Sequence, residues 1–312
     1  MQARRKPDLD IPSSYPSYNG YQNQNIQRPQ TFKEKSSTLF NKVHDYAHRA
    51  DEKLSQLGSP IKPYLPTIGR LLVVITFLED TYRILTDYSG QVFYICVQRG
   101  MNRVLTHIFF ISNIVCMLLG SLLVISRKRL TLGVSCLTYV LISQSLAYGL
   151  IFDMQFFTRN LSLIGGLLLV LSESWAKTKK RVAIPGLLQL DSKDKTQTVT
   201  LIGRILLVFL FVAHVFRTKW TFGSILMNTL SAIGCFLVVI GYKARFSASC
   251  LAISLIIQNA LTNTFWKYQN WNPMRDQLRY EYFQFQAIVG GLILLVNMGA
   301  GGLSIDEKRK IY

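Results

Sequence analysis

The N-terminal part of this sequence lacks any apolar stretch. Residues 1 to about 35 are rich in Pro, Tyr, Asn, Gln and Ser. Such a composition buries too little apolar surface to offset the entropy of ordering, so we predict a disordered segment there. We expect no cleavable signal peptide, because a signal peptide requires an apolar core near the N-terminus. The first membrane helix is therefore expected to act as the insertion signal.

Charged residues are scarce, at 17% of the chain, against about 25% in a typical soluble domain. Hydrophobic residues make up 49%. Several apolar runs reach about 20 residues, which is enough to cross a bilayer as a helix. We therefore predict an all-α, polytopic membrane protein. The net charge of +18 would suggest nucleic acid in a soluble protein. Here the positive-inside rule explains it, and we expect no nucleic-acid partner.

Cysteine is also rare, and the five cysteines form no CxxC pattern. All but Cys96 lie in apolar runs, where a thiol behaves as a small hydrophobe. Neither a zinc site nor a disulfide framework is predicted. The motifs HExxH and GxSxG, the P-loop and the dinucleotide fingerprint are missing as well. We predict a protein that is not an enzyme and needs no metal or cofactor.

Eight apolar segments follow the polar N-terminal part, and each is interpreted as a membrane helix. They span residues 68–87, 104–126, 131–152, 159–175, 201–217, 223–242, 247–266 and 283–302. If the helices alternate in direction, most of the 35 lysines and arginines fall on one side of the membrane. That side is predicted to be cytosolic, and both termini lie on it.

The sequence contains an internal repeat. RNLSLIGGLLLVLSES, with Gly165 and Gly166, has a second copy in QFQAIVGGLILLVN, with Gly290 and Gly291. IGRLLVV recurs as IGRILLV, and ISQSLA as IIQNAL, in the same order. These matches predict a tandem repeat of four helices, and an even number inserts both copies in parallel orientation. The glycine pairs favour close helix packing; a hinge or a ligand contact is the alternative.

The chain therefore divides into five predicted parts, and the first of them includes a predicted helix. An amphipathic helix is expected between Ser36 and Leu57, where apolar residues recur at helical spacing, either on the cytosolic leaflet or packed on the bundle. The parts are a cytosolic tail at 1–60, a first four-helix membrane repeat at 64–175, a polar cytosolic linker at 176–200, a second four-helix repeat at 201–302 and a cytosolic tail at 303–312.

Two acidic residues interrupt the first apolar segment. Glu79 and Asp80 lie in FLEDTYRI, and Arg83 follows on the same helix face. Ionisable groups inside a membrane are costly and mark candidate functional sites. An ion pair at the helix end is the simpler interpretation. The second half has Ala213 and His214 in the equivalent positions, which predicts one asymmetric site rather than two equal ones.

Further polar residues are predicted at the same, lumenal end of the helices. They are Asp153, Arg159, Asn160, Tyr280, Glu281 and Gln284. With the acids they would form one recess from segments 1, 3, 4 and 8, open to the lumen. Each residue alone is also typical of an ordinary membrane interface. Asn160 begins a glycosylation sequon, but it abuts a membrane helix, so we expect the transferase not to reach it.

The chain ends in DEKRKIY, with Lys308 and Lys310 fifth and third from the carboxyl end. This spacing resembles the K-x-K-x-x signal that the COPI coat reads to return membrane proteins to the endoplasmic reticulum. A basic anchor that follows the positive-inside rule is the alternative.

Four stretches together resemble the surfeit locus protein 4 family, which includes a yeast ER-derived vesicle protein. They are FLEDTYRI, FDMQFFTRNLSLIGGLLLVLSES, YEYFQFQAIVGGLILLV and the ending GGLSIDEKRKIY. The resemblance covers about residues 64–312 and departs at Arg309, which separates the two lysines. It implies a multi-pass cargo receptor of the endoplasmic reticulum membrane. Such receptors bind soluble secretory proteins in the lumen, enter COPII vesicles and return from the early Golgi in COPI vesicles.

The resemblance also implies that cargo is recognised through short hydrophobic signals, in some cases near the mature N-terminus. An acidic pair in a lumenal recess suits a free α-amino group, and nearby aromatics would hold apolar side chains. Those aromatics are Phe156, Phe157, Tyr282 and Phe283. We expect further contacts with membrane lipids and with coat subunits, the latter through the N-terminal tail, and leave homo-oligomers open.

Two other functions remain open on the residues alone. A carrier of small molecules or lipids would also use an acid pair inside a membrane segment. An assembly factor for other membrane proteins would bind through lipid-facing or cytosolic surfaces, and the lumenal acids would then be dispensable.

Overall fold

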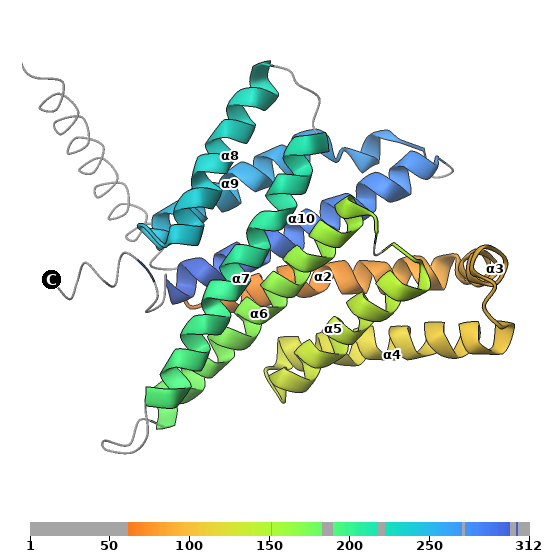
Figure 1. The fold of residues 1–312 in the computed structure, drawn as a ribbon, viewed down its shortest axis with the longest axis horizontal. Helices are drawn as coiled ribbons and strands as arrows, with labels where there is room; N and C mark the ends of the chain where they lie inside the picture. The colour runs from red at the N-terminus through yellow and green to blue at the C-terminus, as the bar shows by residue number, and fades with distance from the viewer. Residues whose placement is uncertain are drawn as a thin grey trace, which may run out of the picture. The chain divides into compact units, whose positions relative to one another are not determined.

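The computed structural model describes residues 62–150, 152–182, 190–217, 222–269, 272–299 and 304 of the chain. In these ranges the chain forms helices (Figure 1). They are α2 (Leu65–Thr86), α3 (Tyr88–Arg99), α4 (Arg103–Ser126), α5 (Leu130–Ala147), α6 (Met154–Val182), α7 (Leu190–Arg217), α8 (Phe222–Ile240), α9 (Ala244–Thr262), the short 3₁₀ helix η1 (Phe265–Lys267) and α10 (Pro273–Met298). The predicted amphipathic helix at 36–57 and the two C-terminal lysines lie outside the described residues.

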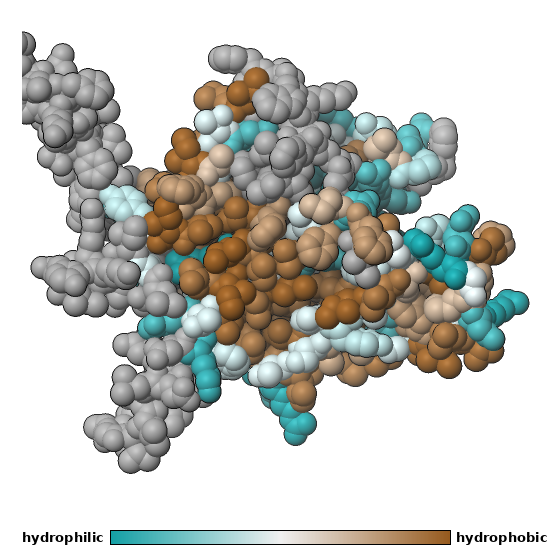
Figure 2. Space-filling view, viewed as in Figure 1, coloured by the Kyte–Doolittle hydropathy of each residue, from teal (hydrophilic) through white to brown (hydrophobic). Residues whose placement is uncertain are grey.

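The helices have the apolar surface of a membrane protein. Five spans among the described residues are long and apolar enough to cross a bilayer. They are α4, α5, most of α6, α9 continued through η1, and α10. Figure 2 shows hydrophobic residues over the central part of the visible face. On α4, for example, Leu119 and Leu122 are more than half exposed, as expected of side chains that face lipid. The prediction of an all-α polytopic membrane protein is confirmed.

Each of the eight predicted segments corresponds to a helix, α2 or one of α4 to α10, although the ends differ. Within the described residues, only five of these helices are long and apolar enough to span a bilayer. In α2 the reason is charge, since this helix carries Arg70, Glu79, Asp80 and Arg83. In α8 the apolar part within the described residues, Ile225–Ile240, is shorter than a full span.

The structure also contains helix that the sequence did not indicate. The 12-residue α3 occupies the expected loop between the first two segments, and it is too short to span a bilayer. The expected linker at 176–200 is partly helical, because α6 continues to Val182 and α7 begins at Leu190. At α10 the helix begins at Pro273 instead of 283, since Asn272 caps it by accepting a hydrogen bond from the Met274 amide at 3.0 Å.

Glycines set the closest helix contacts. A Cβ atom added at Gly290 of α10 would lie 2.5 Å from the carbonyl oxygen of Gly69 of α2. At Gly165 of α6 it would lie 2.9 Å from the carbonyl oxygen of Gly203 of α7. The α2–α10 and α6–α7 interfaces are the most extensive in the bundle. The first helix of each predicted repeat therefore packs on the fourth helix of the other repeat.

The second glycines of the two pairs meet between α6 and α10. A Cβ atom added at Gly291 would lie 3.3 Å from the Cα atom of Gly166. Around this centre, α4 and α5 form one flanking hairpin, with Gly120 against Gly133, and α8 and α9 form another (Figure 1). The packing role expected for the glycine pairs is confirmed.

Candidate functional site

A polar cluster lies where α2 ends, and we call this end of the bundle the Glu79 end. The cluster comprises Glu79, Asp80 and Arg83 of α2, Gln144 of α5, Arg159 of α6, and Arg279, Tyr280 and Glu281 of α10. Its side chains come from the four helices that correspond to predicted segments 1, 3, 4 and 8. The convergence of these helices at one end is therefore seen in the structure.

Both carboxylate oxygens of Asp80 have partners. Arg83, one turn further along α2, donates to Oδ1 and forms an ion pair with it. The Gln144 amide nitrogen donates to Oδ2 at 2.7 Å and so connects α2 to α5. Asp80 is buried, and these two bonds satisfy its charge within the protein.

Glu79 has one paired and one unpaired oxygen. Nε of Arg279 lies 3.1 Å from Oε1, which connects α2 to α10. Oε2 is buried and has no hydrogen-bond partner. Because a carboxylate accepts several hydrogen bonds, this oxygen has the capacity to accept one from a bound donor.

A further ion pair connects α6 to α10. Nη2 of Arg159 lies 3.3 Å from Oε1 of Glu281. The Gln277 amide donates to the same oxygen at 3.2 Å from one turn earlier in α10. The three pairs of the cluster thus join three helices and balance three acids with three arginines.

Aromatic rings lie beside two of these arginines. The guanidinium carbon of Arg83 is 5.0 Å from the centre of the Tyr280 ring. That of Arg279 is 4.9 Å from the centre of the Tyr82 ring. Both distances are typical of cation–π contacts, which contribute about 0.5–1 kcal/mol at exposed sites.

The remaining predicted site residues have varied surroundings. Asn160 is buried and donates to the Ser145 hydroxyl at 2.8 Å, which joins α6 to α5. Asp153 is exposed and caps the first turn of α6, where it accepts from the Phe156 amide at 3.2 Å. Gln284 is 1% exposed, and neither of its amide atoms has a hydrogen-bond partner. An unpaired buried amide costs about 1–3 kcal/mol, so this residue also has capacity for a polar ligand.

An apolar groove of about 180 Å³ lies between α5 and α6. Its polar floor is the Ser145–Asn160 pair. These two residues follow directly after Gln144 and Arg159 of the cluster. Consecutive residues on α5 and α6 therefore belong to the cluster and to the groove, which places both at the same level along these two helices. The other lining residues are Leu141, Ile142, Leu146, Leu150, Phe156, Phe157, Leu161 and Ile164.

The four aromatics expected at the site fall into two groups. Phe156 and Phe157 line the groove. Tyr282 and Phe283 instead pack edge to face with each other, with ring centres 5.6 Å apart. Tyr282 also contacts Phe265 of η1. Aromatic spacing along the sequence does not distinguish these surroundings, because the grouping depends on which helices are neighbours.

A different buried ion pair lies toward the opposite end of α2, which we call the Arg70 end. Nη2 of Arg70 lies 2.8 Å from Oε2 of Glu173 of α6, and the side chains are 2% and 1% exposed. Both side chains are buried and the pair connects α2 to α6, so removing either partner would leave an uncompensated buried charge.

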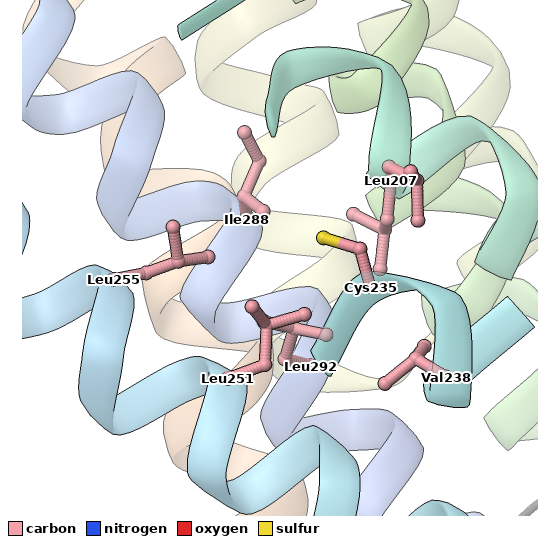
Figure 3. A pocket seen from close by; sticks show the side chains of 8 residues that line it. Leu207, Cys235, Val238, Leu251, Leu255, Ile288 and Leu292 are labelled. Carbon is pink, nitrogen blue, oxygen red and sulfur yellow. The ribbon is translucent and has the colours of Figure 1, made fainter. Parts of the chain in front are cut away.

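A second cavity lies among α7, α8, α9 and α10 (Figure 3). Its volume of about 10 Å³ is that of one water molecule. The walls are aliphatic apart from the Cys235 thiol, and they include Leu207, Val238, Leu251 and Leu255. With no polar partner for a water, this cavity is a packing gap and not a ligand site.

The helices and the cluster define a class of protein, a polytopic helical membrane protein with a polar ion-pair cluster at one end of its bundle. Sequence comparisons define it further. Residues 44–312 match the model of the SURF4 family, and the chain belongs to this family.

Similarity to individual proteins of this family agrees with the match to the family model. The surfeit locus protein 4 homolog of Schizosaccharomyces pombe is 39% identical over 266 residues, covering 84% of this chain and 87% of the relative. The ER-derived vesicles protein ERV29 of Saccharomyces cerevisiae is 39% identical over 254 residues, with coverage of 81% and 79%. The Drosophila melanogaster homolog is 33% identical over 267 residues, with coverage of 86% and 98%. No solved structure matches the chain.

Proposed function

We propose that this protein is a cargo receptor that binds soluble secretory proteins in the lumen of the endoplasmic reticulum and carries them into transport vesicles. The observation that carries the proposal is the buried, unpaired Glu79 oxygen of the polar cluster. The apolar groove between α5 and α6, two of the helices that contribute to the cluster, adds to it. A relative of 39% identity is named as a protein of ER-derived vesicles, which supports a role in vesicle traffic.

In this proposal the Glu79 end faces the lumen. Support comes from the basic residues Arg127, Lys128 and Arg129 between α4 and α5, at the other end of the bundle. Arg127 donates to the Thr67 hydroxyl at 3.0 Å, near the start of α2. Clustered arginine and lysine mark the cytosolic side of a membrane protein.

The ligand we propose is the N-terminus of a mature secretory protein. Its α-amino group would bind Glu79 at Oε2, since Oε1 and both oxygens of Asp80 already have partners. Apolar side chains that follow would enter the groove beside Phe156 and Phe157. Asp80 then acts as an organising residue, which narrows the earlier expectation that both acids bind the amine.

The test is the protein content of vesicles budded from microsomes. We expect a set of soluble secretory proteins to leave with wild-type receptor. For Glu79→Gln we expect packaging of that set to fall about tenfold or more, since a hydrogen bond to a charged group contributes about 1.5–3 kcal/mol. Asp87→Asn is the matched control, because Asp87 is an exposed acid just after the same helix.

Receptor abundance in the microsomes is measured in parallel, because lost packaging must not reflect lost protein. Normal packaging by Glu79→Gln would sink the proposed binding mode. Unchanged protein content together with altered lipid or small-molecule content would favour a carrier. If Glu79 and Asp80 prove dispensable while loss of the protein leaves other membrane proteins unassembled, the protein would instead be an assembly factor.

We further propose that the receptor enters COPII vesicles and returns through COPI, with Lys308 and Lys310 as the retrieval signal. Replacing both lysines by serine is expected to shift the steady-state protein from the endoplasmic reticulum toward the Golgi, as measured by fractionation. An unchanged distribution would show that the two lysines serve only as a basic anchor.

A further inference from the structure

The ion pairs of this protein differ in how easily a ligand could replace one partner. The arginine of the Arg70–Glu173 pair is 2% exposed and sealed from solvent. The Arg279 side chain is 24% exposed, although the Glu79 side chain that it pairs with is only 4% exposed. Solvent thus reaches the cation of this pair while the carboxylate stays buried.

Glu79 also differs from its neighbour Asp80 in spare capacity. Asp80 uses both oxygens, and one of its partners, Arg83, lies on the same helix. Glu79 keeps Oε2 unpaired, and Arg279 reaches Oε1 from another helix. A ligand cation that bound at Oε2 would therefore place two positive charges on one carboxylate, and each would weaken the hold of the other.

Arg279 has a second contact on which to remain after it leaves Glu79. Its guanidinium already lies 4.9 Å from the centre of the Tyr82 ring, and Tyr82 is 55% exposed. The ring face attracts a cation in water-accessible surroundings. A guanidinium that left Glu79 would therefore still have the exposed Tyr82 ring as a partner.

We propose that Arg279 is a tethered competitor for the ligand at Glu79. This inference rests on the proposed function, in which the ligand is a free α-amino group. Without ligand, Arg279 neutralises Glu79 at Oε1. With the ammonium bound at Oε2, the ammonium neutralises Glu79 instead, and Arg279 leaves Oε1 and remains on Tyr82. The buried carboxylate then faces a cation at every stage, which avoids the cost of an uncompensated buried charge.

A competing arginine lowers the apparent affinity of the receptor for its ligand and favours release of the ligand. If the Arg279-bound form makes up about nine-tenths of the free receptor, the apparent affinity for ligand is about tenfold weaker than that of the open site. When the ligand leaves, the returning arginine closes the site against rebinding.

The test measures peptide binding to the full-length protein in lipid nanodiscs. The probe is a fluorescent peptide, Ala-Leu-Val-Gly-Ser-Lys with the dye on the lysine, and its N-acetylated twin is the reference. Wild type, Arg279→Gln, Arg279→Lys and Arg275→Gln are compared by anisotropy. Arg275 is the matched control, since it lies one turn earlier on α10.

We expect Arg279→Gln to bind the free-amine peptide about tenfold more tightly than wild type, with slower dissociation. Arg279→Lys and Arg275→Gln are expected to stay near wild type, and the acetylated peptide to bind none of them. A gain in affinity separates competition from a structural role, because a damaged fold would bind less.

Two outcomes would overturn the proposal in distinguishable ways. If wild type binds the free-amine peptide selectively but Arg279→Gln binds it no more tightly, the competitor role is wrong and the proposed function stands. If none of the proteins distinguishes the free from the acetylated peptide, the proposed ligand chemistry is wrong, and the competitor role fails with it.

Discussion

Glu79, Asp80 and Glu173 each lie beside an arginine, but their surroundings give them different roles. Glu173 is sealed with Arg70 between α2 and α6. Asp80 is held by Arg83 and Gln144, and so organises the cluster. Glu79 alone combines a buried carboxylate, an unpaired oxygen and a partner that solvent can reach. The chemistry of these acids therefore follows from partner and exposure, not from residue type.

The buried Arg70–Glu173 pair gives a prediction for single substitutions. Glu173→Gln leaves Arg70 buried without its counter-ion, and losing one partner of a buried pair costs about 3–5 kcal/mol. We expect a large drop in the unfolding temperature, measured in detergent by intrinsic fluorescence. The double variant Arg70→Met with Glu173→Met is expected to recover most of it, because apolar replacement of a buried pair is often neutral. A double variant as unstable as Glu173→Gln would contradict this account.

Among the helices, α2 and α10 meet at their glycines, and α6 and α7 do the same. These contacts bring backbone against backbone, which leaves no room for a side chain. The arginines and acids of the cluster lie further along the same helices, so their pairing depends on this close approach. A change in helix spacing at the glycines would move Arg279 relative to Glu79.

Neighbouring glycines provide the test at the scale of the helix. Gly165→Ala is expected to destabilise the protein by about 1–3 kcal/mol, because its Cβ atom would lie 2.9 Å from the Gly203 carbonyl oxygen. Gly166→Ala is expected to be tolerated, since its Cβ atom would meet nothing nearer than 3.9 Å. The measurement is the thermal unfolding of the two variants, compared side by side. Equal changes in stability would show that helix propensity, and not packing, determines the effect of these substitutions.

The positions of most helices along the chain can be predicted from the sequence, because apolar runs and glycine pairs are local features of the chain. The α3 helix was missed since its 12 residues are too short to register as a span. In the site, Glu79 and Asp80 were noticed as charges in an apolar segment. Their partners Arg279 and Gln144 were not, because pairing across helices depends on which faces meet, and no local pattern encodes that.

For the whole molecule, the prediction concerns orientation in the membrane. We expect a glycosylation acceptor with a flexible spacer to be modified when inserted at Gly100, the exposed turn between α3 and α4. The same insert at Lys128, between α4 and α5, is expected to stay unmodified. An endoglycosidase-sensitive shift in mass measures both. Modification at Lys128 and not at Gly100 would reverse the assigned orientation and place Glu79 in the cytosol.

The packing of α2 on α10, and of α7 on α6, also constrains how the chain folds during its synthesis. Because Gly69 packs on Gly290, α2 meets its main neighbour only after the long stretch between these two glycines has been synthesised. At about 5–20 residues per second, the wait is roughly 10–45 s. During that time a helix with four charged residues must reside in or beside the translocation machinery without its partner. α10, which emerges late, thus completes the packing of α2, and a ribosome that stalls before α10 leaves a product open to quality control.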